Sequence, residues 1–495
     1  MFIVDLKDAL NTSITENGAE GYATSGKCLV DFNFNLASYR SKGEKCIIND
    51  FTRAWYENKE LALKYLFYAR DIREGAGERR LFRVCISSIV NELDERVFDW
   101  IAKFGRYDDL FVFFGTKLQE GMVEYVGKQL AKDYADMIEN KPISLLAKWM
   151  PSINTSSNQT KKLAKLFIDK LESTNEEYRK ILSTLRKYLD VVERKMCAQQ
   201  YSEINYENVP SQANLKYMDA FLRHDPDRRR AYLESLDKGK VKINSSTSFP
   251  HDIVKSYRNH RFFKNILEYN ATLEGMWKSL PNYVNGTKHI IVVRDGSASM
   301  TTTVGNTSTT ALDVATALSI YFSERCEGQF KDNFITFSHR PKLVDLSCCE
   351  SLHDKLKLCN TYDEVSDTNI EATFDLILNT AIKHNLKQEE IPDLLIISDM
   401  EFNEAVDYSS LENKLFKIIN NKFIDAGYNM PKLIFWNVNS QTNTIPLIEN
   451  ENGVILVSGF SPAIVKLVLS TELDPYKALV NELMSERYKE ITLQK

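Results

Sequence analysis

Three oxygen-bearing side chains follow a short apolar run in the stretch KHIIVVRDGSASMTTT, residues 288–303. Residues 289–294 are mostly β-branched and apolar, as expected for a parallel strand that is buried on both faces. Asp295, Ser297 and Ser299 follow at alternate positions and supply one carboxylate and two hydroxyls. Hard oxygen donors of low total charge suit Mg²⁺ or Mn²⁺, which keep several waters when bound. The stretch is therefore a candidate metal-binding loop.

Two further oxygen donors follow other predicted elements. Asp399 ends the apolar run DLLIISD, and Thr368 lies just before the helix predicted from TNIEATF. The carboxyl ends of parallel strands share one sheet edge, so these donors are expected to converge there with those of residues 295–299. The prediction is a Mg²⁺ or Mn²⁺ site with an open coordination position. The alternatives are strand-end turn residues, since Asp, Ser and Gly favour turns, or intact ligands that carry no metal.

Catalytic interpretations fit these residues less well. A phosphatase that forms an aspartyl phosphate needs a second acid two positions after the first, where this chain has Ser297. A serine hydrolase elbow needs glycines two positions before and after its nucleophile, where Ser297 has Asp295 and Ser299. We therefore expect no enzymatic activity. A metal-dependent hydrolase remains the catalytic alternative, because a metal site can activate water.

The elements that must position these residues lie in the last part of the chain. Residues 281–495 alternate short apolar strands with helices, which predicts a doubly wound parallel sheet with helices on both faces. From about residue 50 to 270 the chain instead shows apolar residues at helical spacing almost throughout, which favours a stacked helical solenoid. The predicted fold is thus α plus α/β, with an α-helical domain over 1–280 and the sheet domain over 281–495.

Composition limits the classes of protein to consider. No apolar run reaches the roughly 18 residues that a membrane span needs, and the eight cysteines include no C-x-x-C pair. A cytoplasmic protein with free thiols is therefore predicted. Residues 281–495 hold 19 Lys and Arg against 29 Asp and Glu, so this part is −10 while residues 1–280 are +5. A polyanion, if bound, is expected on the first part.

Two basic segments in residues 1–280 are candidates for binding phosphates. LFYARDIREGAGERRLFR, residues 66–83, carries arginines around a glycine-containing turn between helices, and RHDPDRRR, residues 223–230, is predicted to be a loop. The alternative is that the arginines of the first segment pair with Asp71, Glu74 and Glu78. The candidate RNA contacts are Arg70, Arg73, Arg79, Arg80, Arg83, Arg228 and Arg229.

DGSAS, the later threonine of TNI and the strand ending in SD resemble the metal-ion-dependent adhesion site of von Willebrand factor A domains. The resemblance implies that Ser297, Ser299 and Thr368 approach Mg²⁺ or Mn²⁺ through their hydroxyls. It implies that Asp295 and Asp399 hold the ion directly or through water, and that an acidic group of a partner takes the open position. The chain departs from the family pattern in one place, where Ala298 stands in the position before the second serine.

The segment of residues 66–83, with FGRYDDL at 104–110 and VPSQANLKYMDAF at 209–221, resembles the TROVE (Ro autoantigen-like) family and its bacterial and phage relatives. In that family HEAT-like helical repeats form a ring that the A domain closes. The resemblance implies a non-catalytic RNA-binding protein of a ribonucleoprotein, whose partner is a single-stranded end or a small structured non-coding RNA. The alternative is a metal-dependent protein–protein interaction scaffold without RNA.

Overall fold

The chain divides into two compact units, which we call the α/β unit and the helical unit. The computed structural model describes residues 10–258, 266, 268–287, 289–337, 340–362, 369–404 and 414–493. The α/β unit comprises Met1–Ala62, Arg73–Ala76 and Ser245–Lys489, and the helical unit comprises Leu63–Ile72, Gly77–Asn244 and Glu490–Lys495. The sequence predicted a division at residue 280. The two compact units divide elsewhere, because the amino-terminal segment up to Ala62 packs with the sheet.

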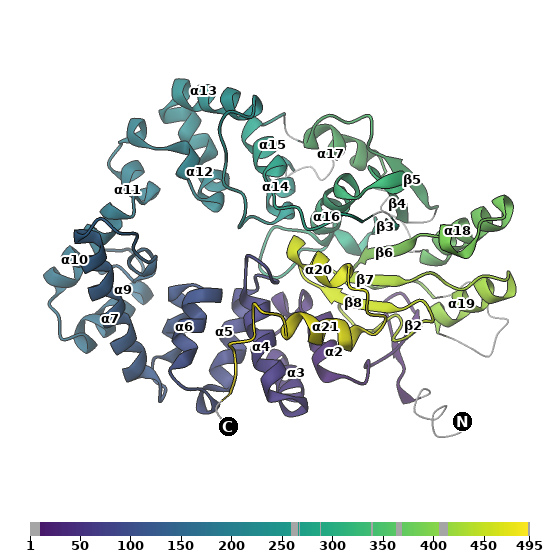
Figure 1. Cartoon of the computed structure of the whole chain (residues 1–495), viewed down its shortest axis with the longest axis horizontal. Helices are drawn as coiled ribbons and strands as arrows, with labels where there is room; N and C mark the ends of the chain where they lie inside the picture. The colour runs from purple at the N-terminus through teal and green to yellow at the C-terminus, as the bar shows by residue number, and fades with distance from the viewer. Residues whose placement is uncertain are drawn as a thin grey trace. The chain divides into compact units, whose positions relative to one another are not determined.

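The α/β unit is built on a mixed sheet of six strands in the order β5-β4-β3-β6-β7-β8 (Figure 1). The strands are β3 (Ile290–Asp295), β4 (Asn333–Phe337), β5 (Lys342–Asp345), β6 (Asp393–Ser398), β7 (Leu433–Asn437) and β8 (Val454–Ser458). The strands β4, β3, β6, β7 and β8 pair in parallel, whereas β5 pairs antiparallel with β4. The prediction of an entirely parallel sheet is therefore wrong at this edge. Only four residues connect β4 to β5, and a parallel crossover needs about a dozen.

The parallel strands β3, β6, β7 and β8 consist mostly of buried β-branched, aliphatic and aromatic residues, which favour strands. Every residue of β3, β7 and β8 is buried, as expected for parallel strands covered on both faces. On one face, α18 (Ile370–His384) and α19 (Leu415–Asp425) share a core with alternate residues of β3, β6, β7 and β8. The helix α16 (Ala311–Arg325) packs against β3, β4 and β6.

The amino-terminal segment, by which we mean residues 10–62, belongs to the core of the α/β unit. It contains β1 (Ser13–Ile14), β2 (Glu20–Gly21), α2 (Cys28–Phe34) and α3 (Glu44–Glu57). Tyr22, Val30 and Phe34 are almost fully buried in the same cluster as the strand residues. The Asn437 side-chain amide donates a 2.8 Å hydrogen bond to the Phe34 carbonyl, which ties α2 to the end of β7.

The remaining helices follow the predicted pattern. In the α/β unit they are α14 (Pro250–Tyr257), α15 (Ala271–Lys278), α17 (Leu352–Thr361), α20 (Val465–Val468) and α21 (Pro475–Leu483). After α4 (Lys59–Arg70), the helical unit contains α5 (Arg79–Ser88), α6 (Arg96–Phe104), α7 (Gln119–Ile138), α8 (Leu146–Trp149), α9 (Asn158–Lys170), α10 (Asn175–Tyr188), α11 (Val192–Cys197), α12 (Ser211–His224) and α13 (Pro226–Asp237). An α-helical region followed by an α/β region is thus confirmed.

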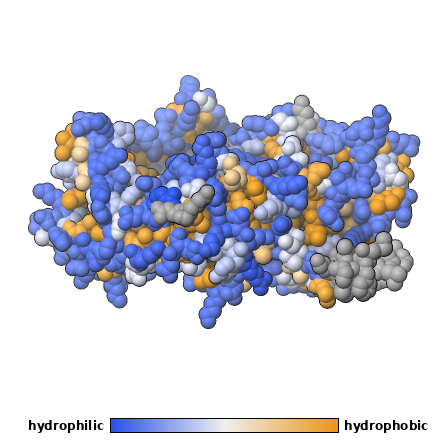
Figure 2. Space-filling model, turned by 60° about the horizontal axis from the view of Figure 1, so that its bottom comes forward, coloured by the Kyte–Doolittle hydropathy of each residue, from blue (hydrophilic) through white to orange (hydrophobic). Residues whose placement is uncertain are grey.

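The surface is mostly hydrophilic (Figure 2), as expected for a chain with 26% charged residues. In the view of Figure 2 hydrophilic residues predominate, and hydrophobic residues form scattered patches. No helix in the described ranges is both long and apolar enough to cross a membrane. All eight cysteines are free thiols.

Candidate metal-binding site

Two aspartates lie at the carboxyl ends of adjacent strands. β3 ends at Asp295, and Asp399 directly follows β6, which pairs with β3 in the middle of the sheet. After β3 the chain forms β4 on one side of it, whereas β6 lies on its other side. The strand order therefore reverses between β3 and β6. Ligands of open α/β sheets bind at such switch points.

Hydrogen bonds fix the Asp295 carboxylate in place. Its Oδ1 accepts a 2.9 Å bond from the backbone N–H of Ser297, and its Oδ2 accepts a 2.6 Å bond from the Ser398 hydroxyl. Asp295 is fully buried, so both bonds are formed away from water. The carboxylate is therefore held in one orientation before any ligand binds.

The two loop serines present their hydroxyls together. Ser297 Oγ and Ser299 Oγ are 3.0 Å apart, and a hydrogen bond from Ser299 reaches Asp399. Ser297 is buried, whereas Ser299, the first residue of the short 3₁₀ helix η6 (Ser299–Thr301), is partly exposed. The group made by Asp295, Ser297, Ser299 and Asp399, which we call the oxygen cluster, is thus open to solvent on the side of Ser299.

Burial and like charge make the two carboxylates costly to ionise. Burial raises the pKa of Asp295, with the hydrogen bonds from Ser398 and Ser297 opposing the rise. Burial, and after it the charge of Asp295, raise the pKa of Asp399 to about 8. Two buried carboxylates so close together favour a bound cation, which would offset both the desolvation and the mutual repulsion.

The donor set fits a hard divalent cation. It offers two carboxylates and two hydroxyls, without sulfur or imidazole, which suits Mg²⁺ or Mn²⁺ better than Zn²⁺. Over the described ranges, no three His, Cys, Asp or Glu side chains gather in a group that could hold a metal. The oxygen cluster depends on hydroxyls instead. Thr368, the fifth predicted ligand, lies outside the described residues.

Glu401 is a buried carboxylate beside the cluster that the sequence did not single out. Its Oε1 accepts hydrogen bonds from the backbone N–H groups of Gln441 (2.8 Å) and Thr442 (3.0 Å) and from the Ser440 hydroxyl (3.1 Å). Its Oε2 accepts a 2.8 Å bond from the backbone N–H of Glu16. Glu401 therefore fastens the loop after Asp399 to two distant segments. The sequence signal was an acid two positions after a predicted ligand.

The arginines of residues 66–83 occupy different environments. Arg70 is buried, and its Nε lies 2.7 Å from Asp109 Oδ2. Arg83 Nε lies 2.6 Å from Asp109 Oδ1, and its Nη2 lies 2.8 Å from Asp108 Oδ2. These partners come from FGRYDDL, so the two motifs meet in the helical unit. Arg73, Arg79 and Arg80 remain exposed.

The second basic segment is helical, and one of its four arginines, Arg229, is buried. The predicted loop is wrong, because α12 ends at His224 and α13 begins at Pro226, whose fixed φ suits the first position of a helix. Arg229 is fully buried among aromatic rings. Arg228 donates to the carbonyls of Tyr201 and Ile204. The prediction that Arg70 and Arg229 contact RNA is therefore wrong, because both side chains are buried in the protein interior.

Nearly the whole chain is similar to known protein families or to a known protein. The profile described as "Domain of unknown function (DUF2828)" matches residues 15–91 and 114–286, together slightly more than half of the chain. The profile described as "Domain of unknown function (DUF7788)" matches residues 289–492. An uncharacterized protein of Acanthamoeba polyphaga mimivirus is 31% identical over 521 residues, which cover 96% of this chain and 87% of that protein. The chain belongs to the DUF2828 family.

Proposed function

We propose that the chain is a non-catalytic binding protein whose α/β unit is a von Willebrand factor A-type module with a bound Mg²⁺ or Mn²⁺. The observation that carries this proposal is the meeting of Asp295 and Asp399 with the paired hydroxyls of Ser297 and Ser299 at the switch point of the sheet. Thr368 is proposed as a further ligand. The ion would supply an open coordination position for an acidic group of a partner.

The hydrogen bonds of Asp295 suit a fixed ligand. Each carboxylate oxygen accepts one bond from the chain, which holds the carboxylate in one orientation, and each keeps a further lone pair that could coordinate an ion. Ser297 Oγ lies against Ser299 Oγ. This arrangement supports binding over a phosphatase or hydrolase reaction.

Thermal unfolding in the presence of metal tests the proposal. Millimolar Mg²⁺ or Mn²⁺ should raise the melting temperature, because an ion bound only by the folded state stabilises it. Titration with Mn²⁺ followed by electron paramagnetic resonance should show one bound ion. Both effects should be lost in Asp295→Ala and strongly reduced in Ser299→Ala, whose side chain is partly exposed.

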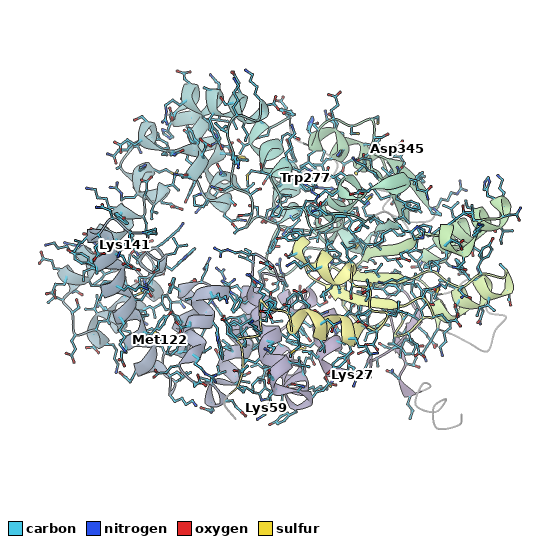
Figure 3. All side chains as sticks on the ribbon, viewed as in Figure 1. Lys27, Lys59, Met122, Lys141, Trp277 and Asp345 are labelled. Carbon is cyan, nitrogen blue, oxygen red and sulfur yellow. The ribbon has the colours of Figure 1, made fainter. Side chains whose placement is uncertain are left out.

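A surface acid provides the matched control. Asp345, at the end of β5 and labelled in Figure 3, is exposed and accepts a hydrogen bond from the backbone of Ser347. Asp345→Asn should keep the full response to metal. Equal responses in wild type and Ser299→Ala, or no response in folded wild type, would exclude the oxygen cluster as the site.

We further propose that the protein is cytoplasmic and that RNA is one of its partners, as the Ro-type resemblance implies. The exposure of Arg73, Arg79 and Arg80 around the turn between α4 and α5 favours this second function. Arg73→Gln with Arg80→Gln should weaken binding of single-stranded RNA and reduce its dependence on salt, since each phosphate contact contributes about one unit to the log–log slope. Wild type that binds no RNA at low salt would favour the metal-dependent protein scaffold instead.

A further inference from the structure

Four guanidinium groups surround two carboxylates where the two motifs of the helical unit meet. Arg70 and Arg83 both contact Asp109, and Arg83 also contacts Asp108. Arg106 contacts Asp108 as well, through its Nε at 2.8 Å and through Nη2. Arg79 is the fourth. These four arginines outnumber the two aspartates that they contact or approach, and three of the four are at least partly exposed.

Arg79 is the arginine that the aspartates do not neutralise. It is the first residue of α5, and Arg83 lies four positions on, on the same face of the helix. Within the described part of the chain, no carboxylate oxygen lies at ion-pair distance from Arg79. Partial burial of the guanidinium, and then the charges of Arg106 and Arg83, lower the pKa of Arg79. Its neighbourhood thus has an excess of positive charge.

The amino end of α5 adds to the positive charge around Arg79. The first turn of α5 contains Arg79 and Arg80 and no acidic residue, and the side chain of Glu78 forms no hydrogen bond that caps the helix. Positive side chains at the amino end of a helix oppose its dipole, so an anion in addition to the carboxylate of the N-cap residue Glu78 would be favourable there.

Contacts with Asp108, Asp109 and Trp149 fix the orientation of the Arg83 and Arg106 guanidinium groups. Two nitrogens of Arg106 contact Asp108, and its guanidinium lies 3.8 Å from the centre of the Trp149 ring. Arg83 uses Nε and Nη2 on the two aspartates. In both side chains Nη1 has no carboxylate partner among the described residues. Donors fixed in this way lose little freedom when a ligand arrives.

We infer that Arg79, Arg83 and Arg106 form a binding site for a phosphate group, with Trp149 holding Arg106 in place. Guanidinium groups match the oxygens of a phosphate in geometry and charge, and such charge-assisted hydrogen bonds are stronger than neutral ones. The phosphate can belong to a free nucleotide or to the end of a nucleic acid chain. The site does not depend on the proposed RNA function, because inorganic phosphate alone should occupy it.

Calorimetric titration of the full chain with inorganic phosphate tests the site. Wild type should bind phosphate, and Arg79→Gln should weaken binding about tenfold or more, because one charge-assisted contact is lost. Arg179→Gln, an exposed arginine on α10, is the matched control and should bind as wild type does. Trp149→Ala should weaken binding, while Trp149→Phe should retain most of it. Equal affinity in Arg79→Gln and wild type, or no phosphate binding by wild type, would overturn the inference.

Two further ligands distinguish the sources of the phosphate. A nucleoside monophosphate that binds more tightly than inorganic phosphate indicates a nucleotide site. A 5′-phosphorylated oligonucleotide that binds more tightly than its 5′-hydroxyl form, with the difference lost in Arg79→Gln, indicates recognition of a nucleic acid end. Phosphate binding with no RNA binding would leave the inference standing and exclude only the RNA function.

Discussion

The Glu401 carboxylate accepts a 2.8 Å hydrogen bond from the backbone N–H of Glu16, which lies 385 positions earlier in the chain. Glu401 follows Asp399 by two residues, so this bond links the amino-terminal segment to the loop that carries a proposed metal ligand. The link continues through Thr15, whose hydroxyl donates to the Phe402 carbonyl, and through Asn17, whose amide donates to the Glu401 carbonyl. The amino-terminal segment therefore helps to shape the edge of the sheet.

Glu401→Gln should lower the free energy of unfolding by about 2–4 kcal/mol. An amide cannot accept the full set of hydrogen bonds that the carboxylate receives, and buried donors left without a partner cost about 1–3 kcal/mol each. Chemical denaturation measures this loss. Glu404→Gln, at an exposed position three residues on, should change stability little. Equal stability of the Glu401 and Glu404 variants would contradict a structural role for Glu401.

Phe34→Ala should destabilise the α/β unit by about 3–5 kcal/mol, because it leaves a cavity in the core shared by α2 and the sheet. Ile14→Ala, at a side chain that is 55% exposed, is the control and should cost little. Residues 245–495 expressed alone, which keep α14 and α15 but lack Tyr22, Val30 and Phe34, should likewise unfold without a sharp transition. A cooperative thermal transition of that fragment would show that the amino-terminal segment is dispensable.

Local patterns in the sequence were sufficient to predict the strands and to place Asp295 and Asp399 at the ends of two of them. The apolar runs that end at Asp295 and Ser398 are strands because their residues favour burial on both faces of a sheet. Long-range partners were not predictable in this way. Glu401 is satisfied by residues 16 and 440–442, and Tyr22 shares a core with strands that are far away in the sequence. The burial of Arg70 depends on Asp109, which lies in another motif.

Ser398→Ala should weaken Mn²⁺ binding about tenfold or more without unfolding the protein. The Ser398 hydroxyl orients Asp295 through its 2.6 Å bond, and groups that orient a metal ligand typically contribute this much to affinity. Ser319→Ala is a matched control, because Ser319 is a buried serine on α16 whose hydroxyl has no partner in the described residues. Unchanged Mn²⁺ affinity in Ser398→Ala would argue against Asp295 as a ligand.

Acid should destabilise the α/β unit through His251. This histidine is buried against the rings of Phe249 and Phe460, and burial lowers its pKa to about 4. Since the unfolded chain titrates near 6.5, it binds more protons than the folded chain between pH 6.5 and 4. The stability due to neutral His251 is therefore complete above pH 6.5 and is lost as the pH falls towards 4. The charged groups around the ring are Asp252, Arg40, Asp313 and Lys255.

The slope of stability against pH measures this effect. One proton taken up on unfolding changes the folding equilibrium about tenfold for each pH unit. His251→Phe should flatten the slope between pH 6.5 and 4, whereas His384→Asn, at an exposed histidine, should leave it unchanged. The same slope in wild type and His251→Phe would mean that other groups govern the acid response.

Arg229→Gln should destabilise the helical unit while leaving any affinity for phosphate unchanged. The Arg229 guanidinium lies 4.8 to 5.3 Å from the ring centres of Tyr206, Phe221 and Tyr232, and the side chain is fully buried. A smaller neutral amide loses these contacts and leaves a cavity between the rings, which costs on the order of 2–4 kcal/mol. Chemical denaturation measures this loss. Arg79→Gln should show the opposite behaviour, with normal stability and weakened phosphate binding, because its side chain is exposed. If Arg229→Gln is as stable as wild type and binds phosphate less well, then Arg229 contacts the ligand and the assignment of the two arginines must be reversed.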